Sequence, residues 1–395
     1  MIPRSDLPDR ELGGPDPLDR RLGRPALSLL DWLRSLFFTR SALGLAPSLT
    51  PAVVFLPLGV ALGPQGVEWL TPLVLQRLDV AVTITLAAFG VLAGIALGRQ
   101  VRAAGRQLIA ASLESGVTVV LVMAAVWYFV VETGVPLAVP AGAMALALGL
   151  SASASSATSA SPDSEAAAAV GTEVADLDDV LPIVVSVVAF ALLPAVAPVP
   201  TWVFMLAPVG VGLAVGAIGW LVFDRAESAA ERVVYVLGAL ALAGGAAAYL
   251  RVSPLAVGLI AGLVWALVPG RADRIARDDI GRVQHPLVVL LLVTAGAEWI
   301  PSAAAAWLLA PYLLFRLVGK IAGAWATAAY LEVRAADLAA YLMPPGVLAV
   351  AFALNFRQLL PAEAGATLVS TVAMGTAAFE LFALAVLPLW RGRTR

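Results

Sequence analysis

The feature that most constrains this chain is a succession of long apolar segments separated by short polar breaks. An α-helix needs ~20 such residues to cross the ~30 Å hydrocarbon core of a bilayer. Backbone polar groups in lipid must be hydrogen-bonded within the protein, which helices achieve by themselves. The pattern therefore predicts an all-α polytopic membrane protein with about twelve transmembrane helices. The segments are residues 49–64, 78–98, 108–131, 136–156, 168–193, 200–223, 232–250, 253–270, 285–300, 302–331, 335–356 and 364–390.

The composition agrees with this class and argues against several others. Hydrophobic residues make up 61% of the chain and charged residues 13%. Cysteine is absent and His285 is the single histidine, so neither a thiolate nor a histidine-rich metal centre can form. The net charge of −2 and the lack of a long basic stripe argue against a nucleic-acid partner. We expect a lipid bilayer as the partner, no cofactor and no enzyme activity.

The arginines predict how the segments are oriented. Residues 1–48 read as a cytoplasmic tail followed by an amphipathic interfacial helix at 26–38, before a transmembrane domain at 49–395. With the N-terminus inside, twenty arginines in tails and short connections lie on the cytoplasmic side. The opposite side receives Arg77, Arg251 and Arg357. Because basic residues are retained inside, we expect both termini to be cytoplasmic.

Lys320 is the most informative of the ionisable residues inside apolar segments. It is the only lysine of the chain. A buried lysine can release its proton, whereas a guanidinium stays charged, so the choice of lysine indicates a function. The alternative is a side chain that reaches the membrane surface. Ionisable groups at membrane depth are costly, and the set is Glu114, Asp178, Asp179, Arg316, Lys320 and Glu380.

Asp178 and Asp179 supply the matching negative charge. Adjacent residues of a helix point about 100° apart, so the pair can address a cation and a counter-charge at once. Asp176 shares a face with Asp179 and is expected nearer the cytoplasmic end. The alternative is that these carboxylates form the solvated first turn of a helix. We expect Asp178 to pair with Lys320 when the site holds no cation.

Two segments carry signals of broken helices. Segment 136–156 runs into the hydroxyl-rich stretch LSASASSATSASP, and segment 335–356 contains Pro344, Pro345 and Gly346. Each lies in the middle of a triplet, 108–193 or 302–390, and the two triplets have opposite orientations. This arrangement is typical of inverted-repeat transporters with a site at the membrane midplane. Asp179 and the hydroxyls of Ser155, Ser156 and Thr158 offer the oxygen ligands that a cation such as Na⁺ prefers.

The chain resembles the monovalent cation:proton antiporter superfamily, and in particular its bacterial sodium/proton antiporters with two adjacent aspartates. The stretches that carry the resemblance are PLGVALGPQGV, AVGTEVADLDDVLPIVV, RLVGKIAGAW, YLMPPGVLAVAFALN and VAMGTAAFELFAL. The resemblance implies two crossed broken helices, and a homodimer in the bacterial inner membrane. In it, core helices at about 108–193 and 302–390 move against dimerisation helices at about 49–98 and 200–300.

The resemblance also implies the roles of individual residues. Asp179 is similar to the aspartate that binds cation and proton, Asp178 to its lysine-paired neighbour, and Lys320 to that lysine. Asp176, Glu114, Arg316 and Glu380 are auxiliary candidates. The expected function is exchange of Na⁺, or else Li⁺ or K⁺, for protons.

Other functions stay open. A sodium-coupled symporter of an organic anion can have the same architecture, and a membrane sensor that transports nothing is also compatible with the sequence. An intramembrane aspartyl protease places its two aspartates on separate helices with a GxGD-type motif, which this sequence lacks.

Overall fold

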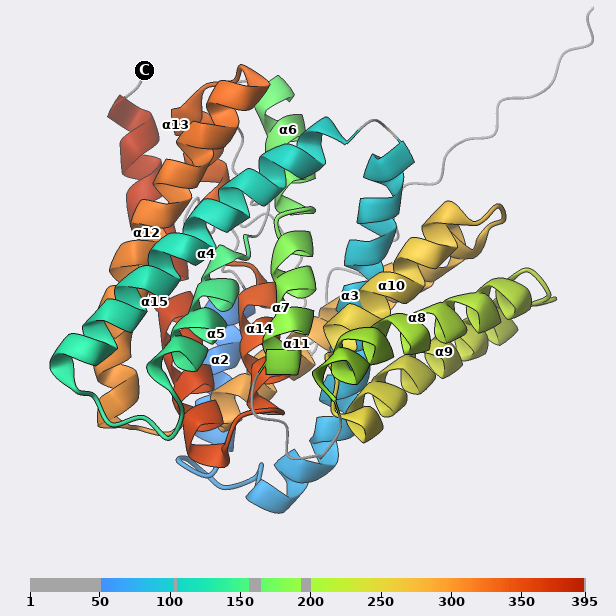
Figure 1. The fold of residues 1–395 in the computed structure, drawn as a ribbon, viewed down its shortest axis with the longest axis horizontal. Helices are drawn as coiled ribbons and strands as arrows, with labels where there is room; N and C mark the ends of the chain where they lie inside the picture. The colour runs from blue at the N-terminus through green and yellow to red at the C-terminus, as the bar shows by residue number, and fades with distance from the viewer. Residues whose placement is uncertain (1–50, 103–104, 156–164, 193–199, 394–395) are drawn as a thin grey trace, which may run out of the picture. The chain divides into compact units, whose positions relative to one another are not determined.

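The structure is a computed structural model that describes residues 51–102, 105–155, 165–192 and 200–393. The predicted tail and interfacial helix, and also Ser156 and Thr158, lie outside these residues. The described elements are helices (Figure 1), and they are α2 Pro51–Leu62, α3 Pro72–Arg102, α4 Arg106–Thr133, α5 Ala141–Ser153, α6 Glu165–Ala175, α7 Val180–Leu192, α8 Thr201–Phe223, α9 Ala229–Leu250, α10 Pro254–Leu267, α11 Ala272–Ala297, α12 Ala303–Leu331, α13 Ala335–Leu342, α14 Val347–Arg357 and α15 Ala362–Arg393.

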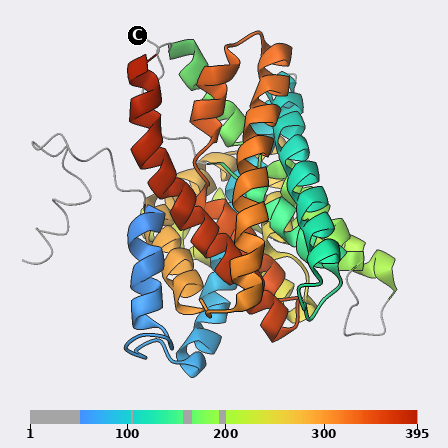
Figure 2. The same cartoon turned by 90° about the vertical axis from the view of Figure 1, so that its left-hand side faces the viewer.

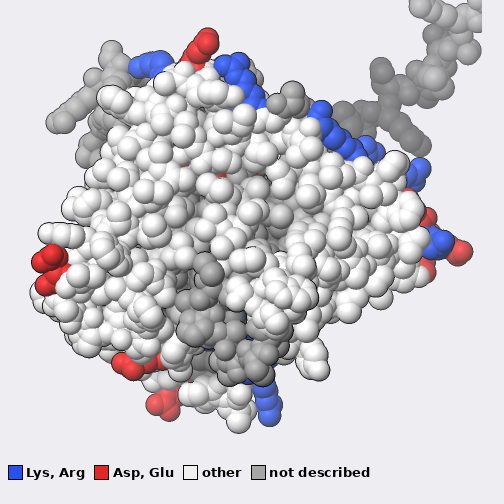
Figure 3. Space-filling model, viewed as in Figure 1, with Lys and Arg blue, Asp and Glu red and all other residues white. Residues whose placement is uncertain are grey.

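Helices long and apolar enough to cross a bilayer confirm the predicted class. Among the described residues there are seven, namely α3, α4, α8, α9, α11, α12 and residues 362–383 of α15. Shorter apolar helices are α2, α5, α10 and α14. A wide uncharged surface separates the charged side chains at the edges of the face in Figure 3. Exposed aromatic residues such as Trp127, Tyr128 and Trp307 lie near helix ends, as is common at membrane interfaces. The chain is therefore a polytopic membrane protein.

Glycines allow the backbones of α3 and α10 to touch. A Cβ added at Gly94 would lie 2.0 Å from the carbonyl oxygen of Leu259, and one at Gly258 would lie 2.0 Å from that of Ala87. Gly90 and Gly262 make the same kind of contact one turn away. Helices in lipid associate through close packing at small residues spaced four apart. This sequence pattern on both helices explains why they form one seam.

Helices α4 and α12 lie side by side in both views (Figure 2). They carry Glu114 and Lys320, whose side chains contact each other. Gly319 and Gly323 of α12 face α4, where an added Cβ would lie 3.0 Å from Cα of Thr118 and 2.8 Å from the carbonyl oxygen of Glu114. The absence of side chains at these glycines brings Glu114 within reach of Lys320.

The two predicted breaks meet each other. Between α13 and α14, residues 343–346 leave the helix, as Pro344 and Pro345 predict. Helix α5 ends at Ser153, and Ala154 is extended. Ser155 forms an isolated antiparallel bridge with Pro345, and the amide of Gly346 donates to the carbonyl of Ala154 at 3.5 Å. The prediction of crossed broken segments is confirmed.

A third interruption was not expected. We predicted Asp178 and Asp179 on one continuous helix, but the structure places residues 176–179 in turns between α6 and α7. The amides of Leu177 and Val180 each bond to the carbonyl three residues earlier instead of four. The sequence signal is Pro182, which cannot donate to the carbonyl of Asp178 and belongs in the first turn of a new helix.

Candidate functional site

Lys320 lies at the centre of the candidate site, in the middle of α12. Its side chain is completely buried, which does not fit a lysine that reaches the membrane surface. The ammonium lies 3.0 Å from Oε1 of Glu114 and 3.4 Å from Oδ2 of Asp178. It also donates to Oγ of Ser155 at 2.6 Å and makes a close contact with the carbonyl oxygen of Ser153. The expected contact with Asp178 is present, together with one to Glu114, which the sequence indicates only as an auxiliary candidate.

Arg316 lies one turn before Lys320 and binds the same unwound segment. Its Nη2 donates to the carbonyl of Ala154 at 2.9 Å, and its guanidinium lies 5.0 Å from the ring centroid of Phe379. The last carbonyls of a helix have no partners within it and carry the negative end of its dipole. Lys320 and Arg316 therefore neutralise the buried end of α5.

Asp178 and Asp179 are both buried, at 0% and 2% exposure, so they do not form a solvated helix turn. Oδ1 of each carboxylate has no hydrogen-bond partner among the described residues. Because an unsatisfied carboxylate oxygen in a low dielectric is costly, the two atoms are suited to bind a proton or a cation. The structure thus brings together Asp178, Asp179, Lys320, Glu114 and Ser155, which we call the ion site.

The remaining predicted residues lie around the ion site or outside the described part. Glu380 is buried on α15 and interacts electrostatically with Arg316. Asp176 is exposed, one turn before Asp179. Pro345 and Gly346 contact Ser155 and Ala154, as given above. Ser156 and Thr158 lie outside the described residues, so their predicted role as ligands stays a prediction. Among the described residues, no group of three or more His, Cys, Asp or Glu could hold a metal ion.

The arrangement of helices matches that of a solved transporter. The chain is similar to the sodium/proton antiporter MjNhaP1 from Methanocaldococcus jannaschii at pH 8, with a TM-score of 0.61 and 16% identity. The match covers 85% of this chain and 92% of that one. No protein-family model and no curated protein sequence matches the chain. The chain has a sodium/proton antiporter fold. The resemblance stated from the sequence is confirmed at the level of fold.

Within this antiporter fold, an ion cluster that sequence reasoning missed joins distant helices. Arg357, at the end of α14, pairs with Asp79 of α3 and with Glu298 at the end of α11. We call these three residues the Arg357 cluster. In the sequence, only the isolated Arg357 after an apolar segment indicates this cluster. Nothing in the neighbouring sequence indicates its two acidic partners.

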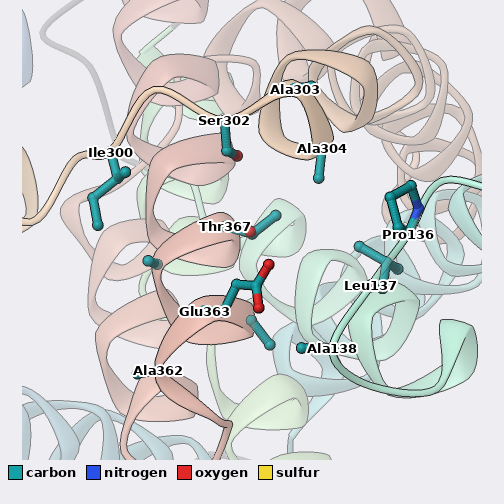
Figure 4. Close-up of a pocket in the computed structure, with 12 residues that line it drawn as sticks. Pro136, Leu137, Ala138, Ile300, Ser302, Ala303, Ala304, Ala362, Glu363 and Thr367 are labelled. Atoms are coloured by element: carbon teal, nitrogen blue, oxygen red, sulfur yellow. The ribbon is translucent and has the colours of Figure 1, made fainter.

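A pocket in the antiporter fold lies apart from the ion site. It has a volume of about 720 Å³ and lies between the α4–α5 connection, the start of α12 and the start of α15 (Figure 4). Its lining is mostly apolar, with Ser302, Glu363 and Thr367 as polar side chains and no Lys or Arg. An organic anion would be repelled by Glu363 and would find no basic residue here. The pocket does not favour the symporter alternative.

Proposed function

We propose that the protein exchanges a monovalent cation, Na⁺ first, for protons by alternating access. One observation carries the proposal. Two adjacent buried aspartates, Asp178 and Asp179, present free Oδ1 atoms beside a buried lysine, where two interrupted helices cross. The antiporter fold supports the same function, although at 16% identity it leaves the cation undetermined.

The chemistry of the ion site accounts for coupling. Na⁺ is a hard cation that binds oxygen ligands, which the two carboxylates and the hydroxyl of Ser155 can supply. Protons compete for the same carboxylate oxygens. Bare carboxylates are costly in a low dielectric, so the loaded forms cross most easily and the two ion fluxes become linked. Asp179 is the proposed shared ligand, since Asp178 already contacts Lys320.

The proposal includes an arrangement in the membrane. We assign residues 108–193 and 302–390 to a moving core and residues 49–98 and 200–300 to dimerisation helices, in a homodimer of the bacterial inner membrane with cytoplasmic termini. Two sets of contacts support the side of the membrane that is predicted for each helix end. Arg106 donates to the carbonyl of Tyr330 at 3.0 Å, and both belong to ends predicted as cytoplasmic. The Arg357 cluster joins ends predicted on the other side.

Proteoliposomes that contain a pH-sensitive dye test this function. Addition of Na⁺, Li⁺ or K⁺ without organic substrate should change the luminal pH with wild-type protein. Asp179→Asn should abolish this change while the protein still purifies as a folded species. Asp278→Asn is the matched control, because Asp278 is the exposed member of another adjacent aspartate pair, on α11.

The result separates the alternatives. A symporter needs its organic anion before it moves Na⁺, and a sensor moves neither ion. Wild-type flux in Asp179→Asn would exclude Asp179 as the shared ligand. If cation addition leaves the luminal pH unchanged in the wild type, the exchange function itself is wrong.

A further inference from the structure

The contacts of Lys320 are not equivalent. An ammonium group has three N–H donors. The closest acceptors are the Ser153 carbonyl, Oγ of Ser155 at 2.6 Å and Oε1 of Glu114 at 3.0 Å, and together they can use all three. Oδ2 of Asp178 is the most distant acceptor, at 3.4 Å. Asp178 is therefore the weakest of the lysine's partners.

Glu114 is held in place to make this contact. Its side chain is completely buried, and the hydroxyl of Thr118 donates to Oε1 at 3.3 Å. Gly323 keeps α12 against the backbone of Glu114, where a Cβ would lie 2.8 Å from its carbonyl oxygen. Among the described residues, Lys320 is the one basic group within 4.0 Å of the Glu114 carboxylate. The contact follows from the packing of α12 against α4.

The pairing of Glu114 with Lys320 determines which carboxylates of the ion site remain available. We propose that Glu114 is a positioning residue, the principal counter-ion that keeps Lys320 at the end of α5. Lys320 then holds Asp178 only weakly, so Asp178 can join Asp179 in binding the transported cation. Arg316 forms no ion pair with either aspartate within 4.0 Å, since its guanidinium contacts the Ala154 carbonyl and the ring of Phe379. The expected effect of Glu114 on transport rests on the proposed function. The pairing of Glu114 with Lys320 does not.

A rescue experiment on thermal stability in detergent tests the pairing. Lys320→Gln leaves two carboxylates without their cation, so the Tm should fall. If Glu114 is the principal counter-ion, adding Glu114→Gln should recover more than half of the loss. Adding Asp178→Asn should recover less, and adding Glu363→Gln, an exposed control, should recover nothing. Greater recovery with Asp178→Asn, or no recovery with Glu114→Gln, would overturn the proposal.

The same comparison serves if Lys320→Gln alone does not fold. The double variant with Glu114→Gln should then yield monodisperse protein, and the double variant with Asp178→Asn should not. The reverse outcome would overturn the proposal. The Tm comparison and the yield of monodisperse protein both work without ion flux. If the wild type shows no Na⁺/H⁺ exchange, the proposed function is refuted, and the stability of the double variants still decides the role of Glu114.

Transport gives a readout that a purely structural residue would not move. In Glu114→Gln, Lys320 loses its nearest charge and turns to Asp178, where it competes with the cation. The KM for Na⁺ should rise by roughly tenfold, with a smaller change in maximal rate. Glu114→Asp should restore part of the affinity. An unchanged KM in a wild-type background that does exchange Na⁺ for protons would overturn the proposal.

Discussion

The Arg357 cluster gives a stability prediction whose size follows from burial. The side chain of Glu298 is 8% exposed and that of Asp79 is 40% exposed. Arg357→Gln removes the cation from both. A hydrogen bond to a buried charged group contributes about 1.5–3 kcal/mol. An exposed ion pair contributes about 0–1 kcal/mol. The expected loss is therefore about 1.5–4 kcal/mol, most of it from Glu298.

Thermal unfolding in detergent, followed by tryptophan fluorescence, measures this loss. The unfolding entropy of a chain of 395 residues is about 0.8 kcal/mol/K, so a loss of that size should lower the Tm of Arg357→Gln by roughly 2–5 °C. Arg77→Gln is the control, since Arg77 is an exposed arginine near Asp79 on the same helix and should leave Tm within about 1 °C. Equal Tm values for the two variants would refute the burial argument.

A buried position lies beside the cluster. The amide of Gln358 lies 3.5 Å from Oγ1 of Thr83, which is 4% exposed. The chain has no cysteine, so Thr83→Cys supplies a single thiol. An impermeant maleimide should label this thiol several-fold faster when Arg357→Gln is also present. Labelling at the same rate in both backgrounds would show that the cluster does not close this end of α3.

Three further results are expected. The Nζ atom of Lys320 has oxygen atoms of four residues within 3.4 Å, an arrangement that a planar guanidinium cannot match. Lys320→Arg should therefore fold but show Na⁺-dependent flux in proteoliposomes that is at least about tenfold lower. Wild-type flux in this variant would show that the charge alone matters. A cysteine at the exposed Asp278 should resist impermeant thiol reagents in intact cells, and rapid labelling would reverse the predicted orientation. Gly94→Val would place Cβ 2.0 Å from the carbonyl oxygen of Leu259 and should destabilise the α3–α10 seam by ~1–3 kcal/mol. Gly238→Val is the control, because Gly238 has open space around it. Equal Tm values for the two variants would contradict the packing argument.

Local signals in the sequence were sufficient for the class of protein and for most members of the ion site. Charge is so costly in lipid that Lys320, Asp178, Asp179 and Glu114 stand out among apolar neighbours without any knowledge of the fold. The break at 343–346 was equally visible, because proline removes a backbone donor wherever it occurs. The turn at 176–179 has a comparable signal in Pro182, which cannot donate to the carbonyl of Asp178.

The tertiary structure decided which of these charges meet. Lys320 and Glu114 are 206 positions apart, and Arg357 and Asp79 are 278 apart. Nothing in either local sequence ranks Glu114 ahead of Asp178 as the partner of Lys320. That order depends on distances of a few tenths of an ångström, set by how closely the glycines of α12 let it approach α4. The cost of burying a charge can be read from hydropathy, whereas its compensation depends on packing between distant helices.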